Sequence, residues 1–144
     1  MASKGKHQPK SPGSAGQRTL AELAEQNQLD FELEFYTAIL ERAPDFVDVL
    51  RAMGNDLTLK GRIKEGLEVD RRLVRMRPRD ALVHYNLACS YAILKKADVA
   101  IQTLRRAIEL GYRDFRYMRQ DRDLDSVRDD PRFRQILREY DQRR

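Results

Sequence analysis

The stretch HYNLACSYAILKKADVAIQTLRRAIEL, residues 84–110, decides the fold class of this chain. Its large apolar side chains recur at three- and four-residue spacing, which is typical of an amphipathic helix and not of a β-strand. Ala88 and Ala100 are small residues within the apolar stripes, where they let two helices approach closely. The pattern is interrupted at Lys95. The stretch therefore predicts two helices, over 81–94 and 97–110, that pack antiparallel because the connection is short.

A second window with the same arrangement precedes this one. Pro44 and Pro78 are one period of about 34 residues apart. Gly54 and Gly66 stand in this earlier window where Ala88 and Ala100 stand in the later one. We therefore predict helices over 46–60 and 63–77 that pair in the same way.

Capping residues extend the helical pattern in both directions. Thr19 and Glu22 have the spacing of a capping box, and Gly61 and Gly111 punctuate helix ends. Aspartates that can accept hydrogen bonds from free backbone N–H groups precede five helical patterns, at Asp30, Asp45, Asp80, Asp114 and Asp130. Together with the four helices above, these signals predict further helices over 19–27, 30–43, 114–120 and 131–141, and hence an all-α chain.

Along these windows the side chains follow the order large, large–small, large, turn, small, large and small. This order resembles that of the tetratricopeptide-repeat (TPR) family. The window that ends at Pro78 departs from the family at Asp70 and Leu73, where an aromatic and a small residue are usual. The segment GYRDFRYMRQDRDLDSVRDDPRFRQIL, residues 111–137, resembles a terminal extension that follows TPR arrays in many bacterial proteins. The resemblance implies a TPR-like α-solenoid of about two to three antiparallel helix pairs with C-terminal capping helices. Its expected units are a degenerate repeat or cap at 19–44, repeats at 45–78 and 79–112, and a cap at 113–144.

The charge of the chain is unevenly distributed. Residues 1–17 hold few large apolar side chains, so we expect a disordered basic tail before a helical domain at 18–144. Four of the five net positive charges lie before Glu22, which leaves a nearly neutral body and disfavours nucleic acid as a partner. The C-terminal third keeps a nucleic-acid-associated factor as the alternative, although nine acids accompany its twelve arginines from Arg105 onward.

Acids and bases also separate along the first half of the body. Residues 22–48 hold eight acids and one base, whereas residues 51–79 hold nine bases and four acids. This gradient either steers a charged partner or pairs neighbouring helices with each other, and pairing is favoured.

Neither a membrane segment nor a disulfide is expected. The chain has one cysteine, Cys89, and no apolar run near the roughly 20 residues that span a bilayer. We therefore predict a cytoplasmic protein without membrane contact.

Catalytic and metal-binding patterns are missing from the sequence. It has no glycine-rich phosphate loop and no nucleophile elbow, and His84 occupies a position where a packing residue is expected. Asp121 and Asp123 resemble the start of a calcium loop, but Ser126 and Arg132 stand where the loop needs glycine and glutamate. We expect no enzyme activity, no cofactor and no metal site; a non-catalytic subunit of an enzyme assembly is a second alternative.

The resemblance also implies where a partner binds. In TPR arrays the first helix of each pair lines a concave groove, and the matching positions here include Thr58, Tyr85 and Cys89. The resemblance thus implies a non-catalytic adaptor that binds a peptide or protein partner in this groove.

One TPR subgroup grips the C-terminal carboxylate of its partner with a basic residue and two asparagines. Arg51, Asn55 and Asn86 match that register, although asparagine is also common at the position of Asn86 as part of the repeat pattern. In the third unit Arg116 fits a basic position, Gln120 does not, and Arg119 lies beside it. These residues extend the candidate groove.

Overall fold

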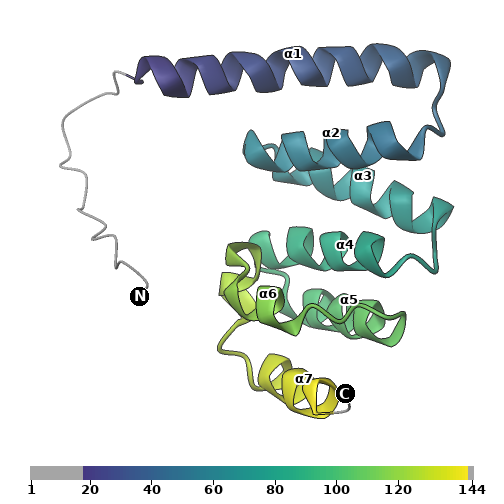
Figure 1. The fold of residues 1–144 in the computed structure, drawn as a ribbon, viewed down its shortest axis with the longest axis vertical. Helices are drawn as coiled ribbons and strands as arrows, with labels where there is room; N and C mark the ends of the chain where they lie inside the picture. Colours follow the sequence, from purple (N-terminus) through teal and green to yellow (C-terminus); the bar gives the residue numbers. More distant parts are fainter. Residues whose placement is uncertain (1–17, 143–144) are drawn as a thin grey trace.

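A computed structural model describes residues 18–142 of the chain, and the predicted basic tail at 1–17 lies outside this range. The described part is all-α and holds no β-strand (Figure 1). None of its helices combines the length and apolar character needed to cross a membrane. The elements are α1 (Leu20–Arg42), α2 (Val47–Leu59), α3 (Ile63–Met76), α4 (Ala81–Ile93), α5 (Ala97–Glu109), α6 (Phe115–Gln120), the 3-10 helix η1 (Arg122–Val127) and α7 (Pro131–Asp141).

The helices pack in the order of the chain. The closest neighbours are α4 with α5 and α2 with α3, and α3 packs on α4 to join these two pairs. Figure 1 shows the resulting stack, with α1 at one end and α7 at the other. Sequential packing of this kind places α2 and α4, the first helix of each pair, next to a shared surface.

Capping chemistry fixes several helix ends as predicted. The hydroxyl of Thr19 accepts a hydrogen bond from the N–H of Glu22, and the Glu22 carboxylate accepts one from the N–H of Thr19. Aspartates cap the first turns of α4, α6 and α7 with their carboxylates. Gly61 and Gly111 follow α2 and α5 with φ of 84° and 118°, a backbone conformation that glycine adopts without a steric penalty.

The predicted break between helices 19–27 and 30–43 is wrong, because α1 is one continuous helix. No glycine or proline lies between Leu20 and Arg42 to interrupt it. Asp30 does not cap a helix and instead forms an ion pair with Lys60, the C-cap residue that follows α2. Asp45 does not cap either, since the N-cap of α2 is Phe46, which makes no side-chain capping bond.

The main hydrophobic core lies between α4, α5 and the C-terminal elements. The last three elements share this core with α4 and α5, and their side chains least exposed to solvent include Phe115, Met118, Leu124, Phe133 and Ile136. η1, which the sequence pattern did not predict, contributes Leu124 and Val127 to this core. A smaller cluster of Leu50, Leu73 and Val83 joins α2, α3 and α4.

One side of α1 is uncovered in the described part of the chain. Phe31 and Phe35 are 64% and 54% exposed, and their rings lie parallel with centroids 6.4 Å apart. In Figure 1 the N-terminal part of α1 extends beyond the end of α2. The tight core is therefore at the C-terminal end of the stack, and α1 is its most exposed helix.

Candidate functional site

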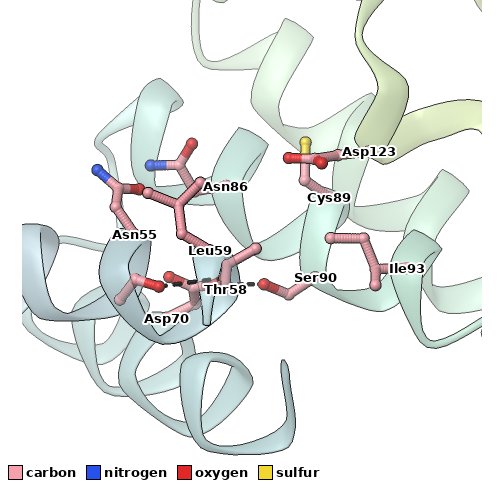
Figure 2. Close-up of a pocket in the computed structure, with 10 residues that line it drawn as sticks. Asn55, Thr58, Leu59, Asp70, Asn86, Cys89, Ser90, Ile93 and Asp123 are labelled. Carbon is pink, nitrogen blue, oxygen red and sulfur yellow. Dashed lines mark hydrogen bonds between the residues drawn. The ribbon is translucent and has the colours of Figure 1, made fainter. Parts of the chain in front are cut away.

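A pocket of about 540 Å³ with both polar and apolar lining residues opens between α2 and α4. Figure 2 shows the residues that line it, which come from α2, α3, α4 and η1. Its lining residues are Gly54, Asn55, Thr58 and Leu59 of α2, Asp70 of α3, Asn86, Cys89, Ser90 and Ile93 of α4, and Asp123 of η1. The described lining holds no lysine, arginine or histidine.

Small residues bring α3 close beneath the pocket. A Cβ atom at Gly54 would lie 3.3 Å from Oδ1 of Asp70, and one at Gly66 would lie 3.1 Å from Oγ1 of Thr58. These are the two positions that the repeat pattern marks as small. The close approach of α2 and α3 sets Asp70 against the pocket.

Asp70 is a buried carboxylate at this pocket, only 7% exposed. Its Oδ2 accepts a hydrogen bond of 2.5 Å from the hydroxyl of Ser90, a contact drawn in Figure 2. Burial raises the pKa of Asp70 to about 6, and the bond from Ser90 acts in the opposite direction. No lysine, arginine or histidine among residues 18–142 forms an ion pair with it.

A second buried acid lies behind Cys89. Asp121 accepts a hydrogen bond of 2.6 Å from the Tyr85 hydroxyl, and its Oδ2 is 3.7 Å from the sulfur of Cys89. The Tyr85 ring stacks on that of Tyr112, with centroids 4.1 Å apart. Burial raises the pKa of the Cys89 thiol, and the charge of Asp121 raises it further, so the thiol is a packing group and a poor nucleophile.

Cys89, Asp121 and Asp123 each place a potential ligand atom within 4.8 Å of the others. Both oxygens of Asp121 already accept hydrogen bonds, one from the Tyr85 hydroxyl and one from the N–H of Asp123. Asp121 is the N-cap of η1. Capping and the bond from Tyr85 account for this cluster, and we assign no metal to it.

The structure brings four of the predicted groove residues together. Asn55, Thr58, Asn86 and Cys89 line the one pocket, from the first helix of each predicted repeat. Figure 2 shows Asn55 and Asn86 beside each other at one side of the pocket and Cys89 at the other. Tyr85 is only 3% exposed and supports the site from within the core.

The predicted basic residues lie outside the pocket. Arg51 forms an ion pair with Asp80, the residue that also caps α4. Arg119 of α6 forms an ion pair with Asp141 at the end of α7. Arg116 is exposed on α6 and does not line the pocket. The carboxylate-binding register of Arg51, Asn55 and Asn86 therefore combines two residues of the pocket with an arginine that already holds an intramolecular partner.

Sequence reasoning missed the acids of the site. Asp70 occupies a position where the apolar stripe of its helix calls for a large side chain, and this departure from the pattern was the available signal. Ser90 gave no comparable signal, because a serine within a helical pattern is ordinary. Asp123 stood out only as part of a calcium-loop pattern that the sequence does not complete.

Many arginines of the C-terminal third are engaged within the protein. Of the ten that the structure describes from Arg105 onward, six form ion pairs with acids, namely Arg105, Arg106, Arg119, Arg128, Arg132 and Arg134. Two acids of the stretch 22–48 form ion pairs with the basic stretch 51–79, in the pairs Asp30–Lys60 and Asp45–Arg72. Two ion pairs thus join the acidic stretch to the basic stretch in the described part of the chain.

Comparison with known proteins gives one distant similarity. No family model matches the chain. A stretch of 92 residues is 28% identical to a chloroplastic protein of Arabidopsis thaliana, and the match covers 62% of this chain. It covers 28% of that relative, so the chain spans less than a third of the length of the protein it resembles.

Proposed function

We propose that this chain is a non-catalytic TPR-type adaptor that binds an extended segment of a partner protein in the pocket between α2 and α4. One observation carries the proposal: Asn55, Thr58, Asn86 and Cys89, four residues of the predicted groove, line one pocket although they come from two separate helices. Residues one period of about 34 apart meet in this way when successive helix pairs stack in register.

The packing of small residues supports a repeat architecture. Ala88 and Ala100 are almost fully buried, and Gly54 and Gly66 occupy the corresponding close approach between α2 and α3. The buried side chains of α6, η1 and α7 cover the last pair, as a solenoid cap does. A TPR-like solenoid with a C-terminal cap is the interpretation that joins these features.

The mixed polar and apolar lining of the pocket supports binding of a peptide over catalysis. Its asparagines and hydroxyls suit hydrogen bonds to a peptide backbone, and the buried thiol of Cys89 is held in its neutral form. A location in the cytoplasm stays a prediction.

A peptide-binding experiment tests this function. The full-length chain is immobilised and exposed to a random peptide library with blocked termini, and the retained peptides are remeasured by isothermal titration calorimetry. We expect Asn86→Ala to weaken binding by about tenfold, because it removes a hydrogen-bonding side chain from the pocket. Asn27→Ala, on the exposed surface of α1, is the matched control and should leave the affinity unchanged. Equal affinities for both variants would place binding elsewhere.

A further inference from the structure

The pocket is rich in groups that accept hydrogen bonds. The Ser90 hydroxyl donates its proton to Asp70, and the Thr58 hydroxyl donates to the backbone carbonyl of Gly54 at 3.1 Å. Each hydroxyl oxygen thereby keeps only its lone pairs for a ligand. The carboxylates of Asp70 and Asp123 add further acceptors. The amides of Asn55 and Asn86 can both donate and accept, so a ligand that satisfies the hydroxyls and carboxylates must itself supply donors.

The charge of the pocket also has one sign. Asp70 and Asp123 are its ionisable carboxylates, and the described lining contains no basic side chain. A buried carboxylate without a cation is costly, because a neutral hydroxyl replaces only part of its lost hydration. Asp70 has Ser90 as its hydrogen-bonding partner and is 7% exposed. A cation that reaches Asp70 would remove part of this cost.

Two helix ends add to the negative potential. Thr58 and Leu59 belong to the last turn of α2, and Ser90 and Ile93 to the last turn of α4. The C-terminal end of a helix carries a partial negative charge that favours a nearby cation. The pocket therefore lies where two helix dipoles and two carboxylates act in the same direction.

We propose that the pocket binds a lysine or arginine side chain of the partner polypeptide, with Asp70 as the buried counter-ion and Asp123 as the second acid. The inference rests on the proposed function, because it names the side chain that the bound segment inserts. The bound group is then a cation, whereas a carboxylate-binding groove would bind an anion. Arg51, the base that such a groove would use, forms an ion pair with Asp80 and lies outside the pocket.

A library with blocked termini tests the inference directly, because side chains are then the only charges on each peptide. The full-length chain should retain peptides with lysine or arginine enriched at one position. Replacing that residue with norleucine, which keeps the aliphatic stem, should weaken the retained peptide by about tenfold or more.

Variants of the protein locate the counter-ion. Asp70→Asn and Asp123→Asn should each weaken binding of the basic peptide by about tenfold. Asp129→Asn, an exposed acid before α7, removes the same charge away from the pocket and should change the affinity less than twofold. Circular dichroism checks that Asp70→Asn is folded, and the exposed Asp123 provides a variant that does not disturb a buried position.

The pH dependence gives an independent signature. Ser90 of α4 is the hydrogen-bonding partner of Asp70. The other ionisable groups that line the pocket are the neutral Cys89 thiol of α4 and Asp123 of η1, whose pKa is also raised, by burial and by its acidic neighbours Asp121 and Asp125. Binding of the basic peptide should weaken between pH 7.5 and pH 5, because the pKa of Asp70 is raised to about 6 and its charge is lost in this range. Most of this dependence should disappear in Asp70→Asn.

The failures of the two proposals are distinguishable. Retained peptides without a basic preference, or an affinity unchanged in both Asp70→Asn and Asp123→Asn, would overturn the cation site and leave the peptide groove in place. A chain that retains no peptide at all would overturn the peptide groove and the cation site with it.

Discussion

The hydroxyl of Ser90 on α4 donates a hydrogen bond of 2.5 Å to Oδ2 of Asp70 on α3, and so ties together the two predicted repeats. Asp70 lies against the pocket between α2 and α4, and it is buried without a cation among the described residues. The bond therefore links the stability of the helix stack to the protonation state of Asp70 in the pocket.

Ser90→Ala should destabilise the protein by about 1–3 kcal/mol at pH 8, because the ionised Asp70 would lose its donor. The cost should shrink at pH 5, where Asp70, with its pKa raised to about 6, is mostly protonated and needs the donor less. Urea denaturation at the two pH values measures the difference. The same substitution in an Asp70→Asn background should be pH-independent; a cost that stays pH-dependent there would separate Ser90 from Asp70.

Asp56→Asn should stabilise the protein at pH 8. Asp56 is 8% exposed on α2, and burial together with Glu32 of α1 raises its pKa to about 6. An acid whose pKa is raised in the folded state binds its proton more tightly there, so the folded state gains stability as pH falls through 6 towards the ordinary value of 3.8. The substitution should therefore add about 1–3 kcal/mol at pH 8 and less at pH 5.

Urea denaturation at both pH values checks the Asp56 prediction. Glu25→Gln, which removes an exposed acid from α1, should change the free energy of unfolding by less than about 0.5 kcal/mol. A destabilised Asp56→Asn variant at pH 8 would show that the carboxyl pair with Glu32 holds α1 on α2.

Gly54→Leu should destabilise the protein by roughly 2 kcal/mol despite the higher helix propensity of leucine. A Cβ at this position would already lie 3.3 Å from Asp70 Oδ1 and 3.4 Å from Cγ1 of Val69, so a longer side chain must push α3 away from α2. Thermal unfolding compares it with Asn55→Leu, which adds the same side chain at the next, exposed position of α2. Equal melting temperatures would mean that α3 moves aside without cost.

Phe133→Ala should destabilise the protein by about 3–5 kcal/mol. The Phe133 ring is 1% exposed where α7 packs with the core of α4, α5, α6 and η1. Phe35→Ala, on the uncovered side of α1 at 54% exposure, is the matched control and should cost less than about 0.5 kcal/mol. Chemical denaturation of both variants measures how firmly the C-terminal elements cover the stack; similar costs would argue against a closed C-terminal core.

The sequence by itself determined the elements that depend on near neighbours. Periodic apolar residues give α2 to α5 almost at their predicted bounds, and Asp80, Asp114 and Asp130 cap helices within three residues of themselves. Short-range signals failed where a distant partner competed, as at Asp30, which binds Lys60 thirty residues away and leaves α1 unbroken. The apolar period also placed Asn55 and Asn86 on the first helix of each pair, and so on one pocket.

Tertiary structure alone decided what that pocket offers a ligand. Asp70 meets Ser90 from 20 residues away, and Asp121 meets Tyr85 from 36 residues away. Arg51 could have faced a partner, but it pairs with Asp80 at the start of α4 instead. The sequence specifies the charge and hydrogen-bonding capacity of each side chain. The packing of the helices decides which group comes within about 3 Å to pair with it.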